Sequence, residues 1–335
     1  MIENTVKNTI KEYGLINKKD KVMLGVSGGQ DSMCLLYLFH GLREEFAAKR
    51  PASSLQLVCV HFNHSLRKEA DREESFVKDV CKKLKIKFIS DKKDVKSFYK
   101  GDSLEQTARN LRLEFFLKCF RQTKIKKIAL AHHKDDLVET ILMRIIRGTG
   151  LKGLRGFSPN SKFRGLNIIR PLIGVNKEDV LQWLKKKKIA YCIDKSNFED
   201  KFFRNNLRLN LMPVLRKLNP CVEDNVYNLA RNLSLDYDFI YTFSYNKFQE
   251  LKRSENKRDV RLDLEGLKKL SQAVFNNVIR VAIEEAKGNL RKIEGRHLSE
   301  IRDLVFNRPR GSIVDLPDLF VKKEEKLLII QTLIL

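Results

Sequence analysis

Short apolar runs alternate with amphipathic stretches through the first half of the chain. Four such runs, at residues 22–26, 55–60, 86–89 and 128–131, are separated by helix-like segments. Strands that alternate with helices in this way are typical of βαβ units, in which helices cover both faces of a parallel sheet. We therefore predict an α/β fold built on a Rossmann-like parallel sheet.

Two of the intervening segments indicate where helices lie. Residues 70–84 carry four apolar side chains on one helical stripe, namely Phe76, Val77, Val80 and Leu84. A second helix is predicted to begin at Ser103, because Ser103 and Gln106 form a capping-box pattern. The polar face of that helix carries Glu105, Arg109 and Arg112.

The pattern changes after Leu218, where Asn219-Pro220 breaks the chain. Helical stretches follow at residues 224–251, 267–286 and 297–306, and a hairpin is predicted over residues 312–330. We expect two domains, residues 1–218 and a smaller, mainly helical domain of residues 219–335.

The net charge of the chain indicates the kind of partner that it binds. Lys and Arg number 66 against 42 Asp and Glu, which gives a net charge of +24. An excess of this size favours a polyanionic partner, with nucleic acid first. A membrane surface would call for a basic amphipathic helix or a lipidation signal, and the sequence contains neither. The alternative is a large number of solvated lysines with no specific partner.

The length of the apolar stretches and the spacing of the cysteines indicate the cellular compartment of the protein. The first residues lack the apolar stretch of a signal peptide, and no run of eighteen apolar residues occurs. The six cysteines are scattered and never form CxxC. We expect a cytoplasmic protein with reduced thiols.

The segment GVSGGQDS, at residues 25–32, lies between a predicted strand and a predicted helix. Small residues there let backbone amides approach phosphate oxygens, and the following helix adds positive charge at its start. The lysine of the common GxxxxGK[ST] loop is absent. The predicted phosphate-binding residues are Ser27, Gly28, Gly29, Gln30, Asp31 and Ser32. A tight turn without a ligand is the alternative.

A second polar segment, AHHKDDLVET at residues 131–140, follows the fourth strand at the sheet edge where such folds bind ligands. Asp136 and Glu139 are three residues apart, so both carboxylates share one face of the helix. They could hold an ammonium group, position Mg²⁺ on ATP or withdraw a proton. Helix capping by acidic residues is the alternative.

Three polar residues, His61, Asn63 and His64, follow the second strand at the same edge. Two histidines without cysteines or an acidic cluster fall short of a zinc ligand set. We expect no metal bound by a protein cluster, and we interpret His61, together with His133 of the second segment, as lining of a nucleotide pocket. Turn residues in a basic patch are the alternative.

Two groups of basic residues suit phosphate. Arg109 and Arg112 could both reach one phosphate and offset charge that develops there, with Arg112 favoured because Glu105 can pair with Arg109. Residues 194–197 and the segment RNNLR, which contains Arg204, Asn205 and Arg208, suit phosphates and base edges. Surface charge without a ligand is the alternative for the second group.

Taken together, these segments resemble a known family. SGGQDS resembles the PP-loop of the N-type ATP pyrophosphatases. The blocks SGGQDS, HFNHSLR, SLEQTARNLR, AHHKDDLVETILMRIIRGTGLKGLRG, IIRPL and DKSNFEDKFFRNNLR follow the order found in bacterial tRNA(Ile)-lysidine synthases. The resemblance covers most of the first 215 residues. It is looser beyond residue 218, where GSIVDLPDLFVKKEEKLLII is similar to the family's C-terminal domain.

The resemblance implies a PP-loop catalytic domain over residues 1–218, a C-terminal tRNA-binding or accessory domain over 219–335, and a two-step reaction. The wobble cytidine of an isoleucine tRNA with a CAU anticodon would be adenylated by ATP with Mg²⁺. The amine of L-lysine would then displace AMP to leave lysidine. A homodimer is also implied, and the chain resembles shorter members that lack a further terminal domain.

The resemblance also implies roles for individual residues. Residues 27–32 would bind ATP, with Asp31 near the Mg²⁺-bound phosphates. Asp136 and Glu139 would serve lysine and the reacting centre, and Arg112 or Arg109 would be the catalytic arginine. The residues that would face the tRNA are Arg204, Asn205 and Arg208.

Other functions compete with this one. A PP-loop enzyme that inserts sulfur at a cytidine would use cysteine pairs or an iron–sulfur cluster, and the missing CxxC argues against it. GMP, NAD and argininosuccinate synthetases share the loop but leave the +24 charge unexplained. A non-catalytic RNA-binding relative is a third alternative, against which the presence of Asp31, Asp136 and Glu139 argues.

Overall fold

The computed structural model of the chain describes residues 2–17, 19–49, 55–65, 69–99, 101, 104–193, 203–254, 256 and 259–333. Their contacts divide into two compact units, Met1–Arg231 and Asn232–Leu335. The division falls within helix α10 (Val222–Leu251), after the Asn219-Pro220 break at which we place a domain boundary. The extents 1–218 and 219–335 stay a prediction.

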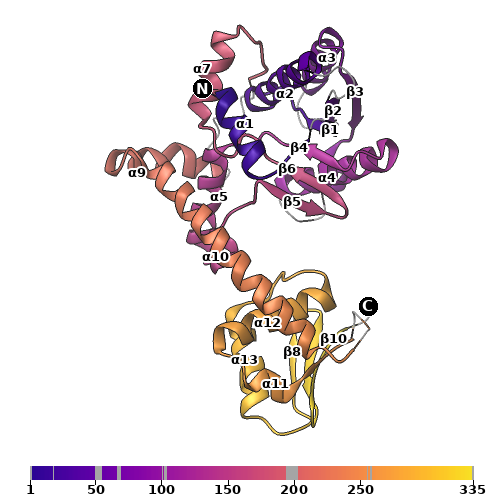
Figure 1. The fold of residues 1–335 in the computed structure, drawn as a ribbon, viewed down its shortest axis with the longest axis vertical. Coiled ribbons are helices and arrows are strands. Elements are labelled where there is room, and N and C mark those ends of the chain that lie inside the picture. Colours follow the sequence, from indigo (N-terminus) through magenta and orange to yellow (C-terminus); the bar gives the residue numbers. More distant parts are fainter. Residues whose placement is uncertain are drawn as a thin grey trace. The chain divides into compact units, whose positions relative to one another are not determined.

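Unit 1 is built on a six-stranded sheet in the order β3-β2-β1-β4-β6-β5 (Figure 1). Its strands are β1 (Lys21–Gly25), β2 (Gln56–Asn63), β3 (Lys87–Lys92), β4 (Lys127–Ala129), β5 (Asn160–Phe163) and β6 (Leu166–Ile169). Neighbours from β3 to β6 are parallel, and β5 runs antiparallel to β6. The four strands predicted from apolar runs are therefore present and parallel, which confirms the predicted fold class.

Helices cover both faces of this sheet. Successive side chains of β2 point to opposite faces, and each set is buried in an apolar core. Leu57 and Cys59 belong to one apolar core, whereas Val58 and Val60 belong to another. The first core packs against α1 (Ile2–Glu12), α2 (Gln30–Lys49), α3 (Ala70–Lys83) and α7 (Lys177–Lys186). The second packs against α4 (Leu104–Thr123), which begins where the sequence predicts it, although Ser103 lies outside the described residues.

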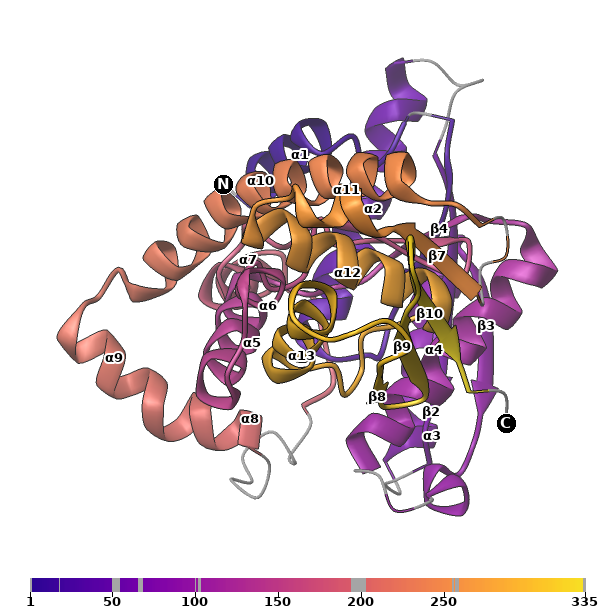
Figure 2. The same ribbon diagram turned by 90° about the horizontal axis from the view of Figure 1, so that it is seen from below.

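The rest of unit 1 lies around α5 (Lys134–Arg147). Figure 2 shows α6 (Leu151–Leu154) beside α5. Residues 203–218 form a continuous helical run, which consists of α8 (Phe203–Asn206), a π-helical turn η4 (Leu207–Leu211) and α9 (Met212–Leu218). Elsewhere in unit 1, a short 3-10 turn η2 (Val95–Phe98) follows β3. The η4 turn packs against α5, and a π turn of this kind often marks a functional position.

The β5–β6 hairpin is not predicted from the sequence, because its strands have four residues each. Its turn is nevertheless of the type that matches strand twist. Arg164 and Gly165 both have positive φ, 47° and 85°. Two successive positive values are typical of a type I′ hairpin turn.

Unit 2 combines helices with a four-stranded antiparallel sheet in the order β7-β10-β9-β8. The strands are β7 (Asp259–Asp263), β8 (Ile313–Leu316), β9 (Leu319–Lys323) and β10 (Leu327–Thr332), and the helices are α11 (Leu264–Lys268), α12 (Gln272–Lys287) and α13 (Gly295–Phe306). The predicted hairpin over residues 312–330 contains three strands, and β7 pairs with the last of them. Buried residues of the sheet and of α12 and α13 form one apolar core.

Within the described ranges, no helix is both long and apolar enough to cross a membrane.

Candidate active site

The glycine loop joins the end of β1 to the start of α2 and closes around one hydroxyl group. Ser32 Oγ accepts hydrogen bonds from the amides of Ser27 and Gly28, both at 3.1 Å, and donates to the Gly29 carbonyl at 2.9 Å. Ser32 is 6% exposed, whereas Ser27 is exposed. The loop is therefore a preformed turn at the carboxyl edge of the sheet, where ligands of such folds bind.

Gly28 is required by this turn. Its φ is +96°, a region that other residues rarely adopt. A Cβ at this position would lie 3.3 Å from Val77 Cγ2. The Gly28 carbonyl also accepts a hydrogen bond from the Cys192 amide at 2.9 Å, so the chain after α7 stabilises the loop from the side.

Asp31 lies in the first turn of α2, one residue after the helix begins at Gln30. Its Oδ2 is 3.6 Å from His133 Nε2, while its Oδ1 is buried without a hydrogen-bond partner among the residues that the structure describes. The unpartnered oxygen is an acceptor without a donor or cation, and such a group at a loop of this type suits a ligand.

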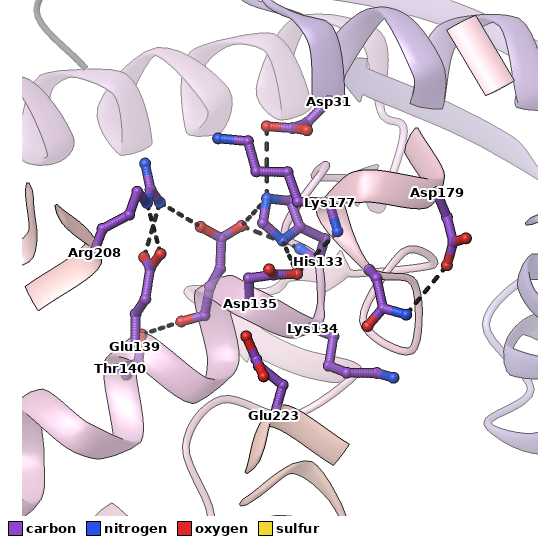
Figure 3. Close-up of polar contacts among 12 residues, drawn as sticks. Asp31, His133, Lys134, Asp135, Glu139, Thr140, Lys177, Asp179, Arg208 and Glu223 are labelled. Carbon is purple, nitrogen blue, oxygen red and sulfur yellow. Dashed lines mark hydrogen bonds and ion pairs between the residues drawn. The ribbon is translucent and has the colours of Figure 1, made fainter. Parts of the chain in front are cut away.

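His133, which precedes the first residue of α5, lies among three carboxylates, one from α2 and two from the first turn of α5 (Figure 3). Its Nε2 lies 3.6 Å from Asp31 and 3.5 Å from Asp136, and its Nδ1 lies 3.4 Å from Asp135. Burial opposes its positive charge, but Asp136, Asp135 and Asp31 outweigh burial and raise the pKa of His133 to about 10. The imidazolium links the loop to α5.

The neighbouring carboxylates of Asp135 and Asp136 are ionised, and they also accept hydrogen bonds from backbone amides. Asp136 Oδ2 accepts from the His133 amide at 3.1 Å, so the helix-capping alternative is realised together with the ion pair. Asp135 Oδ2 accepts from the Lys177 amide, the first of α7, at 2.9 Å. Burial raises the pKa of Asp135, yet its bonds to His133 and Lys177 lower it to about 2 overall. The pKa of Asp136 is lowered too, because His133 and Arg204 outweigh its burial.

Glu139 is almost completely buried and binds two arginines. Arg204 Nε donates to its Oε2 at 2.8 Å, and Arg208 donates to Oε1 at 2.7 Å and to Oε2 at 2.9 Å. Asp136 Oδ1 lies farther from both guanidinium groups, at 3.5 and 3.9 Å. Arg204 and Arg208 thus bring α8 and η4 against α5, and Glu139 shares a helix face with Asp136 as its spacing predicts. A tRNA contact by Arg204, Asn205 or Arg208 stays a prediction.

His61 contacts the backbone at the start of the loop, whereas Asn63 binds side chains of α3. His61 is 3% exposed, its Nδ1 lies 2.9 Å from the Val26 carbonyl, and burial lowers its pKa. Asn63 Nδ2 donates to Asp71 and Glu74, both at 2.9 Å. The described residues contain no group of three or more His, Cys, Asp or Glu that could hold a metal ion. Arg67 and residues 194–197 of the predicted segments lie outside the described residues.

Arg109 and Arg112 lie on α4 with exposed side chains. The Glu105 side chain lies outside the described part, so the predicted pair with Arg109 stays untested. Arg112 and Arg170 act electrostatically on His132. Burial is the main cause that lowers the pKa of His132 to about 3, and these arginines add to it while Asp136 opposes them. His132 is therefore neutral beside the cationic His133.

Some residues of the site are not identified by the sequence patterns. A cavity of about 230 Å³ is lined by Asp135, Glu139, Lys177, Arg208, Met212 and Arg216. Lys177 and Arg216 come from α7 and α9, outside the motifs identified in the sequence. Their only signal is charge, which is common in a chain with 66 Lys and Arg.

Comparisons with known proteins cover both units. Residues 1–215 match the family described as "PP-loop domain", and residues 262–321 match that described as "TilS substrate binding domain". Among solved structures, the U34-tRNA thiolase NcsA from Methanococcus maripaludis, with its [4Fe-4S] cluster, has a TM-score of 0.57 at 18% identity, over 70% of this chain and 78% of that one. At this identity the likeness shows the fold alone.

Three curated relatives share one name. The tRNA(Ile)-lysidine synthase of Clostridium tetani is 36% identical over 93% of this chain and 65% of its own length. Those of Clostridioides difficile and Petrotoga mobilis are 32% and 33% identical, over 98% and 90% of this chain and 70% and 96% of their own lengths. The chain thus spans about two thirds of the first two relatives and nearly all of the third. With both family matches and these identities, the chain belongs to the tRNA(Ile)-lysidine synthase family.

Proposed function

We propose that this protein ligates L-lysine to the wobble cytidine of an isoleucine tRNA with a CAU anticodon, forming lysidine. The cytosine O2 attacks the α-phosphate of ATP and pyrophosphate leaves. The ε-amine of lysine then attacks C2, the C2–O bond to AMP breaks, and the amine loses a proton. The observation that carries this proposal is the glycine loop joined through Asp31 and His133 to the carboxylates of α5, in a chain with these relatives.

ATP binding is assigned to residues 27–32, with His61 and His133 behind and beside the loop. The amides at the start of α2 and the small loop residues favour a polyphosphate. Asp31 fits Mg²⁺ as a single carboxylate ligand, because its Oδ1 is buried and unpartnered among the described residues. When bound, Mg²⁺ neutralises phosphate charge. His133 holds the other oxygen of Asp31 in place.

Lysine handling is assigned to Asp136, supported by Glu139. The oxygens of Glu139 already accept three bonds from Arg204 and Arg208, whereas Asp136 Oδ1 lies 3.5 Å or more from both. Asp136 therefore keeps more acceptor capacity for an ammonium group or its proton. Arg112 or Arg109 would offset charge at the α-phosphate during adenylation.

The partners follow from the reaction. The net charge of +24 favours binding of tRNA, and the match over residues 262–321 supports a substrate-binding role for unit 2. A cytoplasmic location agrees with a tRNA substrate. A homodimer stays a prediction of the family resemblance.

The deciding experiment incubates the protein with ATP, Mg²⁺, labelled lysine and an unmodified isoleucine tRNA, followed by mass analysis of the nucleosides. We expect AMP, pyrophosphate and a cytidine that gains lysine and loses water. Release of pyrophosphate that does not depend on the tRNA would contradict the substrate assignment. A sulfur-containing cytidine would favour thiolation instead, and binding of tRNA without turnover would favour the non-catalytic relative.

A further inference from the structure

The cavity next to α5 is small and is lined by charges of both signs. Its volume is about 230 Å³, and its lining consists of Asp135, Glu139, Lys177, Arg208, Met212 and Arg216. At about 30 Å³ for each water molecule, it has room for roughly seven or eight waters. The glycine loop, residues 27–32, does not contribute to the lining that the described residues form. The cavity therefore suits a second ligand that is smaller than ATP, of the size of a free amino acid.

The two arginines of the lining already have counter-charges. Arg208 binds both oxygens of Glu139, at 2.7 and 2.9 Å. Arg216 donates from Nε to Glu223 Oε1 at 2.5 Å. A ligand that enters the cavity therefore meets guanidinium groups whose charge the folded chain compensates.

Lys177 is the cation of the lining that lacks a counter-charge. Its backbone is fixed, because its amide donates to Asp135 Oδ2 at 2.9 Å at the start of α7. Its side chain is half-buried and forms no ion pair or hydrogen bond within the described ranges. The lining holds three cationic side chains against two anionic ones, so the excess is one positive charge. An anionic group of a ligand is favoured beside the Lys177 ammonium.

Asp135 offers the opposite charge in the same cavity. Its Oδ1 lies 3.8 Å from Arg216 Nη2, which is longer than a hydrogen bond, so this oxygen can accept from a ligand. Met212 is 3% exposed and gives the cavity an apolar wall. An ammonium donor, a carboxylate acceptor and an aliphatic chain in one molecule match these three groups, and a free diamino acid has all of them.

The cavity also lies next to the carboxylate to which lysine handling is assigned. Asp135 and Glu139 are four residues apart on α5, so they share a helix face, and both line the cavity. Asp136 follows Asp135 and shares a face with Glu139 as well. A lysine anchored in the cavity by its α-carbon end can extend its ε-amine along Glu139 toward Asp136. Figure 3 shows Lys177 and these carboxylates together.

We propose that this cavity, hereafter the carboxylate pocket, binds the α-carboxylate of free lysine through the Lys177 ammonium and its α-ammonium through Asp135. The inference rests on the proposed function, because it assigns the end of the lysine substrate that does not react. The pocket makes the protein specific for a free amino acid. A diamine without a carboxylate leaves Lys177 unpaired, and a lysine residue inside a polypeptide has no free carboxylate to offer.

The test compares Lys177→Gln with Lys186→Gln. Both lysines lie on α7, so the variants lose the same charge from one helix, but Lys186 is exposed and outside the lining. Calorimetric titration, with a non-hydrolysable ATP analogue present, measures the affinities for L-lysine and for cadaverine, which is lysine without its carboxylate. We expect Lys177→Gln to weaken lysine binding at least about tenfold, the contribution of a hydrogen bond to a charged group. Its affinity for cadaverine, and both affinities of Lys186→Gln, should stay at the wild-type values.

The comparison of the two ligands decides the inference. If Lys177→Gln weakens lysine and cadaverine equally, Lys177 does not contact the carboxylate and the inference is overturned. A wild-type protein that binds lysine no better than cadaverine would overturn it as well. The affinity for ATP, titrated alone, separates the two anions. A loss of ATP affinity in Lys177→Gln with unchanged lysine binding would overturn the inference and assign the ammonium to a phosphate.

A second ligand tests the role of Asp135. The analogue ε-aminocaproate keeps the carboxylate and the reacting amine but lacks the α-ammonium, so the wild type should bind it at least about tenfold more weakly than lysine. Equal affinities would overturn the contact with Asp135. Lysidine formation on tRNA is measured separately. Selective lysine binding without lysidine would contradict the proposed function and leave the carboxylate pocket in place, whereas lysidine formation with equal lysine and cadaverine affinities would do the reverse.

Discussion

Two pairs of arginines lie near α5 in opposite surroundings. Arg204 and Arg208 share the buried carboxylate of Glu139, whereas Arg144 and Arg170 donate only to neutral oxygens. The first pair has its counter-charge in the folded chain. The second has none among the described residues. The difference indicates that the first pair holds α8 and η4 against α5 through a shared carboxylate, whereas the second pair holds the chain after α5 through hydrogen bonds to neutral oxygens.

Electrostatics explains why the same residue type serves both purposes. A buried ion pair is maintained only where its geometry compensates the loss of hydration, and the bonds of 2.7 to 2.9 Å to Glu139 meet that condition. A guanidinium that finds only neutral oxygens keeps its charge uncompensated. Its binding to an anion is then favourable, provided that the anion can displace water.

The largest expected effect concerns Asp31, in the first turn of α2, which pairs with His133 at the start of α5. Asp31→Ala leaves His133 between Asp135 and Asp136, so the fold and tRNA binding should persist. AMP formation should fall by about 10²–10³, because a preorganised charge at the phosphates is lost. Pyrophosphate release in single-turnover assays measures this. Asp79→Ala, an exposed control on α3, should behave as the wild type. Near-normal AMP formation by Asp31→Ala would remove the catalytic role given to the loop.

The next effect tests the compensated pair directly. Glu139→Gln keeps the size of the side chain and leaves Arg204 and Arg208 with only the more distant carboxylate of Asp136, so the free energy of unfolding should fall by about 3 kcal/mol. Urea denaturation measures it. The matched control is Glu114→Gln, whose pair with Arg164 is exposed and should contribute less than about 1 kcal/mol. If the two variants lose equal stability, Glu139 is not the structural partner of these arginines.

A smaller effect depends on pH. The pKa of His133 is raised to about 10, from about 6.5 in the unfolded chain, so its stabilising charge is fully present below pH 6.5 and is lost as pH rises through 10. Between pH 7 and 10 the wild type should lose about 2–4 kcal/mol more than His133→Gln does. Urea midpoints at both values measure the difference. Parallel losses in the two proteins would show that His133 is not charged among the carboxylates.

Local patterns in the sequence predict much of unit 1. The four apolar runs correspond to β1, β2, β3 and β4. They could be predicted because the hydrophobic pattern of neighbouring residues distinguishes a strand from a helix. The position of Asp31 at the start of α2 and the shared face of Asp136 and Glu139 follow from spacing as well. The β5–β6 hairpin and strand β7 are not predicted, because four or five residues carry too little periodicity.

By itself the sequence determined the parallel sheet, the glycine loop between β1 and α2, and the carboxylates on one face of α5. Only the tertiary structure decided which charges meet. Glu139 binds arginines 65 and 69 residues away, and Arg170 is buried beside Phe157 without an anion. The physical reason is that periodicity reports the burial of neighbouring residues, whereas ion pairing depends on distances that packing sets between remote parts of the chain.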